Sequence, residues 1–133
     1  MLNTASHLCQ TRFATIIAAL ILSMTLHGGA AAADAVQARK DITAMGLEYN
    51  GQNFAKAAGN GDLVAVQLFL DAGMDVNEGG GAAIGLAAGR GKTAMVKFLL
   101  TKGAKPTSSA LQYARTRGYK DIEKILADAG AKE

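Results

Sequence analysis

An internal repeat constrains this chain more than any other feature of its sequence. Six glycines form two series with a fixed offset of twelve residues: Gly61, Gly91 and Gly118, followed by Gly73, Gly103 and Gly130. Within each series the successive glycines lie 30 and then 27 residues apart. A period of this length is typical of stacked helical units, so the sequence predicts a repeat array instead of a single globular core.

Each unit predicts two short helices separated by its first glycine. Apolar residues lie seven positions before that glycine and alanines lie four positions before it, which places both on one face of an inner helix. Apolar residues recur seven and eight positions after it, which predicts an outer helix of about ten residues. The second glycine ends that helix, since glycine adopts the left-handed conformation without a Cβ penalty. The expected core is Phe54, Ala57, Leu68, Phe69, Ile84, Ala87, Phe98, Leu99, Leu111, Ala114, Ile125 and Leu126.

The units resemble ankyrin repeats. In register they read FAKAAGNGDLVAVQLFLDAGMDVN, IGLAAGRGKTAMVKFLLTKGAKP and LQYARTRGYKDIEKILADAGAK. Residues 73–77, GMDVN, are close to the Gly-Ala-Asp-Val-Asn ending of the family, whereas residues 52–55 and 82–85 lack the proline and histidine of its Thr-Pro-Leu-His tetrapeptide. The resemblance, to a short bacterial-type array, implies an all-α solenoid of about three helix-turn-helix units. Its repeats would span about 51–80, 81–107 and 108–133.

The repeats are shorter than those of the family. Spacings of 30 and 27 residues fall below the roughly 33 that ankyrin repeats show. The missing residues lie between units, where the family carries β-hairpin fingers. We therefore expect the fingers to be trimmed to plain loops, with Gly79–Gly81 as a flexible remnant of one.

Both ends of the array carry features of caps, which repeat proteins need in order to close the stack. Val36 to Met45 predicts a helix with Ala38 and Ile42 on the same apolar stripe as Met45, and residues 34–50 would form an N-terminal capping helix and linker that packs under Phe54.

At the other end, the third outer helix has Glu123 and Ala127 where the first two carry valine and leucine. A fourth unit would have covered these positions. Their loss of apolar character marks the third unit as the C-terminal cap.

The N-terminal residues 1–33 predict a cleaved signal peptide. The apolar run from Phe13 to Leu26 follows Arg12 and precedes glycines and an alanine tract. Cleavage after Ala33 would start the mature chain at Asp34 and place it in the periplasm or outside the cell. An uncleaved anchor is the alternative, but fourteen apolar residues are fewer than the about 20 that span a bilayer, so no stable membrane insertion is expected after cleavage.

Cleavage would remove His7, His27 and Cys9, which are the only histidines and the only cysteine. The mature chain could then hold no Ser-His-Asp triad, Cys-His pair or Cys/His zinc site. The segment GRGKT at residues 89–93 ends like a phosphate-binding loop, but Leu86 stands where that loop needs its first glycine. We therefore expect no catalytic, cofactor-binding or metal-binding residues.

Charge is spread unevenly over the mature chain. Residues 34–78 hold three basic and seven acidic side chains, giving −4, whereas residues 79–133 hold ten basic and four acidic ones, giving +6. The basic half favours an acidic protein partner or contact with the acidic half of a second copy. Solubility alone is an equally good explanation. Aromatic residues make up only 5% of the chain, which argues against nucleic acid as the partner.

The resemblance implies a non-catalytic module that binds another protein. The binding row would be the residues just before each first glycine, Asn60, Arg90 and Arg117, with Tyr119 beside them; a second possible location is the loop from Glu78 to Gly81. A stabilising or inhibitory, immunity-type partner of an exported enzyme or toxin is one alternative. An enzyme of unknown type is another, which the missing histidine and cysteine disfavour.

Overall fold

The computed structural model describes residues 31–132, and the chain from Ala35 onward forms one compact unit. After a first helix at residues 31–44 come α2 (Gly51–Asn60), α3 (Leu63–Asp71), α4 (Glu78–Gly89), α5 (Thr93–Thr101), α6 (Ser108–Thr116) and α7 (Lys120–Asp128). No strand occurs between residues 31 and 132, and the predicted all-α class is confirmed. The proposed leader, apart from its last three residues, lies outside the described part of the chain.

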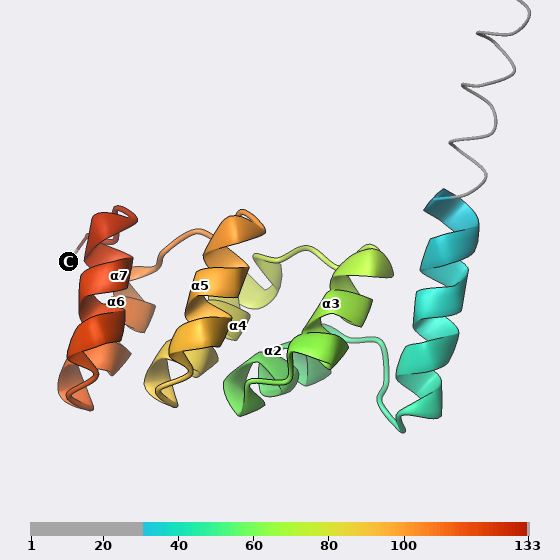
Figure 1. The fold of residues 1–133 in the computed structure, drawn as a ribbon, viewed down its shortest axis with the longest axis horizontal. Coiled ribbons are helices and arrows are strands. Elements are labelled where there is room, and N and C mark those ends of the chain that lie inside the picture. Colours follow the sequence, from blue (N-terminus) through green and yellow to red (C-terminus); the bar gives the residue numbers. More distant parts are fainter. Residues whose placement is uncertain (1–30, 133) are drawn as a thin grey trace, which may run out of the picture. The chain divides into compact units, whose positions relative to one another are not determined.

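The six labelled helices form three stacked pairs (Figure 1). The inner helices α2, α4 and α6 pack side by side in one layer, and α3, α5 and α7 cover them on one side. We call Gly61, Gly91 and Gly118, which lie between the two helices of each pair, the turn glycines. The residues eight positions after them are fully buried, namely Phe69, Leu99 and Leu126. The predicted register is therefore confirmed. The positions seven after the glycine are only partly buried and pack against the edge of this core.

Side-chain caps explain where several of the helices begin. The Asp62 carboxylate accepts a hydrogen bond from the backbone N–H of Ala65 at 3.0 Å and so starts α3. The Thr107 hydroxyl accepts from the N–H of Ala110 at 3.1 Å at the start of α6. Each cap satisfies a backbone donor that the first helical turn leaves without a partner. The two caps therefore set the first residues of α3 and α6.

The triglycine segment, Gly79–Gly81, is not the flexible loop that the sequence predicted. Gly79, Gly80 and Gly81 have φ values of 65°, 68° and 84°, so the chain makes a left-handed turn before the right-handed part of α4 begins. The N–H of Gly81 donates to the carbonyl of Asn77 at 3.0 Å. Three successive residues in this conformation require glycine, because a Cβ costs about 1–2 kcal/mol at each such position.

Substitution of Gly81 tests this turn. A Cβ at Gly81 would lie 2.9 Å from the Thr107 Cγ2 methyl, whereas one at Gly80 would meet nothing within 4 Å. Gly80→Ala should therefore lower the free energy of unfolding by about 1–2 kcal/mol, and Gly81→Ala by about 2–4 kcal/mol because crowding adds to the backbone cost. Thermal unfolding gives the comparison. Thr107→Ser removes the methyl and keeps the capping hydroxyl, so Gly81→Ala in that background should fall to the Gly80→Ala level; an unchanged difference would contradict the contact.

The N-terminal helix closes the first unit, as predicted, but not through all the expected residues. Ala38 and Ile42 are buried in the same core as Phe54, whereas Met45 is 45% exposed and Leu47 packs on the core in its place. The prediction for Met45 was wrong because the chain turns at Gly46, whose φ is 74°, and the Leu47 N–H donates to the Ile42 carbonyl at 3.1 Å. This glycine turn brings Leu47 onto the core at the helix end.

Polar and aromatic contacts also fix this N-terminal helix. The carbonyl of Ala72 accepts from Arg39 Nη2 at 3.4 Å and from the Tyr49 hydroxyl at 3.1 Å. The Arg39 guanidinium lies 4.7 Å from the Tyr49 ring centroid, and that ring stacks on Phe69 at 5.9 Å. The end of α3 is therefore tied directly to residues 35–49.

The third unit carries a polar outer face, in line with its expected role as a cap. Glu123 lies on α7 and accepts from Arg115 Nε at 3.0 Å and from Lys120 Nζ at 3.2 Å. These hydrogen bonds lower the pKa of the Glu123 carboxyl from its ordinary value, and the bond from Arg115 has the larger effect. The charged face replaces the apolar contacts that a further unit would need.

Candidate functional site

The inner helices expose two parallel rows of side chains on the face that α3, α5 and α7 leave open. We call Asn60, Arg90 and Arg117 the turn row, since each immediately precedes a turn glycine. One helical turn earlier lie Lys56, Leu86 and Tyr113, which we call the middle row. Residues four apart lie on the same helical face, so the rows form one continuous surface over α2, α4 and α6.

The structure brings the residues of the turn row together, as expected, but each of its two arginines already donates a hydrogen bond within the protein. Arg90 Nη1 donates to Asn60 Oδ1 at 2.7 Å, which joins the first two units. Arg117 Nη1 donates to the carbonyl of Gly89 at 2.7 Å, which joins the second and third. A guanidinium has five N–H donors, and each of these bonds uses one. The row is thus held in place and still presents two positive groups with donors to spare.

Tyr119 lies beside the turn row at the next turn, where its ring rests on a glycine. A Cβ at Gly91 would lie only 2.8 Å from Tyr119 Cε1, so the ring fills the space that the missing side chain leaves. The Lys92 side chain lies over Gly61 in the same way, since a Cβ at Gly61 would lie 3.1 Å from Lys92 Cδ. Tyr119 itself remains 36% exposed. Tyr119 therefore joins two units and also shows part of its ring to solvent.

Sequence reasoning missed the middle row. The Tyr113 ring is half exposed and lies across α4, where a Cβ at Gly89 would sit 3.5 Å from its Cβ. Leu86 is partly exposed on the neighbouring helix. The signal was available, because both residues lie four positions before an arginine of the turn row, and helical spacing puts such pairs on one face. An aromatic and an aliphatic side chain thus lie next to the two guanidiniums.

A groove between α2 and α4 has a volume of about 600 Å³. Its lining comprises Gly51, Gln52, Ala55, Lys56, Glu78, Gly79, Ala82, Leu86 and Arg90. The groove joins two expected site residues, since Glu78 lies near the start of α4 and Arg90 directly follows its end. Arg117 and Tyr119 are not part of its lining. Of the predicted site residues, Glu78 and Arg90 therefore lie on one groove.

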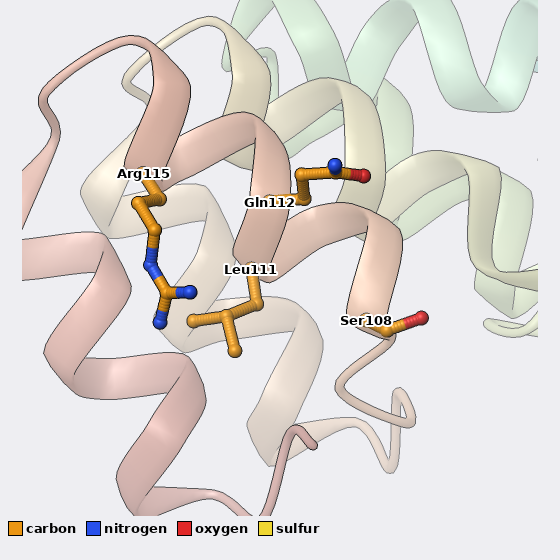
Figure 2. A pocket seen from close by; sticks show the side chains of 4 residues that line it. All are labelled: Ser108, Leu111, Gln112 and Arg115. Carbon is orange, nitrogen blue, oxygen red and sulfur yellow. The ribbon is translucent and has the colours of Figure 1, made fainter. Parts of the chain in front are cut away.

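A second pocket, of about 380 Å³, lies on α6 at the C-terminal end of the stack (Figure 2). Its lining residues, Ser108, Leu111, Gln112 and Arg115, all come from this one helix. Leu111 is almost completely buried, and Arg115 already pairs with Glu123. Two of its four lining side chains are therefore already engaged, one in the core and one in an ion pair.

Two negative observations apply to the described part of the chain only. Residues 31–132 contain no group of three or more His, Cys, Asp or Glu side chains that could hold a metal ion. No helix in this range is long and apolar enough to cross a membrane.

Comparison with known proteins adds one match. A family model described as ankyrin repeats (3 copies) matches residues 54–133. Neither a curated protein nor a solved structure matches the chain.

Proposed function

The chain belongs to the ankyrin-repeat family, and on that premise we propose that it is a non-catalytic module that binds another protein through the turn row and the middle row. The observation that carries the proposal is the exposed Tyr113 ring beside two arginines that are held in fixed positions. Tyrosine and arginine are enriched among the residues that dominate binding energy in protein interfaces. Their fixed positions reduce the conformational entropy that binding would cost.

The charge of this surface indicates an acidic partner. Arg90 and Arg117 each keep N–H donors in the planar arrangement that matches a carboxylate. Lys56 of the middle row is exposed and adds a third positive group on the same face. A surface of one sign attracts the opposite sign and speeds association. We therefore propose that the partner presents carboxylates to the turn row.

The proposal also includes export, which rests on residues 1–33. The apolar run and the following alanine tract support a leader that is cleaved after Ala33. Mass spectrometry of the chain recovered from the exported fraction should then give a mature form that begins near Asp34. A chain of full mass, Met1 to Glu133, in the membrane fraction would contradict cleavage.

Affinity capture tests the binding function. The full chain serves as bait in an extract of exported proteins, and the captured protein is identified and then produced separately. We expect a partner with an acidic surface that binds the purified chain directly. An exported enzyme or toxin as this partner would place the chain among stabilising or inhibitory proteins. Turnover of a captured molecule by the chain would contradict a non-catalytic role.

A further inference from the structure

The groove between α2 and α4 is charged with opposite sign at its two ends. Glu78, Ala82, Leu86 and Arg90 follow each other at intervals of four along its α4 wall. The first is acidic and the last is basic, with a small and an aliphatic side chain between them. Ala55 adds a second small residue from α2. The groove thus has Glu78 at one end and Arg90 at the other, with small and aliphatic side chains between them and the exposed Lys56 on its α2 wall.

The side chains of Glu78 and Arg90 are held in place by different contacts, and each can still pair with a charged group of a bound protein. The Glu78 side chain crosses the start of α2, since a Cβ at Gly51 would lie 2.7 Å from Glu78 Cγ. Within residues 31–132 no hydrogen bond or ion pair reaches its carboxylate. Arg90 is fixed by its bond to Asn60 and keeps further donors. An occupant can therefore pair with both ends without breaking an existing ion pair.

The distance between the ends limits what can bridge them. The right-handed part of α4 from Ala82 to Arg90 rises by about 12 Å at 1.5 Å per residue, and Glu78 lies before it. An extended chain covers about 3.3–3.6 Å per residue, so about four to six residues span the groove. A free amino acid, whose charges are much closer together, would not reach both ends.

We propose that this groove binds an extended segment of the partner protein that carries one basic and one acidic side chain, about four to six residues apart, with apolar residues between them. The inference rests on the proposed protein-binding function and specifies the partner more closely. The basic side chain pairs with Glu78 and the acidic one with Arg90. The intervening residues cover Ala55, Ala82 and Leu86. The order of the two charges in a segment decides the direction in which that segment lies in the groove.

A peptide library tests the proposal without knowledge of the natural partner. The immobilised full chain is used to select binders from a displayed library of random twelve-residue peptides. Selected peptides should contain one basic and one acidic residue at the stated spacing, in either order, enriched at least tenfold over the unselected library. In the variant Glu78→Lys both ends of the groove are basic, so the selected peptides should carry two acidic residues at that spacing instead. A control variant, Asp71→Lys, makes the same change of charge at an exposed position on α3 and should select the original pair of opposite charges.

The remaining outcomes count against the proposal. Selected peptides without a fixed spacing, an unchanged charge pair on the Glu78→Lys variant, or no enrichment at all would each overturn it. Its failure can be told apart from failure of the proposed function by using the protein captured in the affinity experiment. If that protein binds the full chain and the Glu78→Lys variant equally, while Arg90→Glu/Arg117→Glu loses affinity, the binding function stands and the proposal for the segment is wrong.

Discussion

Leu99→Ala is expected to lower the free energy of unfolding by about 2–5 kcal/mol. Leu99 is fully buried on α5 of the middle unit, and the equivalent residues Phe69 and Leu126 belong to the same core. Truncation removes apolar contacts and leaves a cavity that a well-packed stack cannot close fully. A domain of this size is stable by only about 5–15 kcal/mol, so the loss is a large share of the total. Urea unfolding followed by circular dichroism measures it.

Lys97→Ala is the matched control for this prediction. Lys97 lies two positions earlier on the same helix and is exposed, so its truncation should change the free energy of unfolding by less than about 0.5 kcal/mol. Equal effects of the two substitutions would mean that the helical register is wrong. A second unfolding transition in Leu99→Ala would show that the units unfold separately, contrary to one continuous core.

The fold was largely predictable because its signals are local and repeated. Each turn glycine sets the end of one helix and the start of the next, and the burial of Phe69, Leu99 and Leu126 follows from their common offset. The same reasoning gave a wrong prediction for Met45. Its spacing matched the apolar stripe, but the turn at Gly46 brings Leu47 onto the core instead, and a periodic pattern does not contain the hydrogen bonds that form such a turn.

The triglycine turn and the site were only partly predictable. Glycine permits both an open loop and a left-handed turn, and the sequence pattern does not distinguish between them. The turn row was predicted from its position before each glycine. Its hydrogen bonds were not, since the bond from Arg117 to Gly89 joins residues 28 positions apart. Tyr113 was not predicted because it lies one helical turn before Arg117, away from the glycines that mark the repeat.

The second large effect is expected at the turn row. Arg90→Glu/Arg117→Glu should weaken binding of the captured partner at least about 100-fold, which corresponds to about 2.7 kcal/mol. Each reversal replaces an attraction for the partner's carboxylates with a repulsion, and arginines at such positions are frequent hot spots. The double variant also loses the bonds to Asn60 and Gly89, each worth about 0.5–1.5 kcal/mol of stability. Its melting temperature should therefore fall by a few degrees.

Two controls separate binding from stability and from net charge. Leu99→Ala is expected to lose at least as much stability while it leaves both arginines and the inner-helix face in place, so it should retain full binding. Lys97→Glu/Lys124→Glu makes the same change in net charge on the outer helices, where both residues are exposed. It should weaken binding only slightly and mainly through a slower association rate.

The dissociation constant of the captured partner for these four proteins, the wild type and the three variants, tests the central claim most directly. Isothermal titration calorimetry at one salt concentration, below the melting temperature of every variant, supplies all four values. The account predicts that only Arg90→Glu/Arg117→Glu loses affinity, by at least about 100-fold. An unchanged dissociation constant for that folded variant, or an equal loss in Lys97→Glu/Lys124→Glu, would show that the inner-helix face is not where this protein binds its partner.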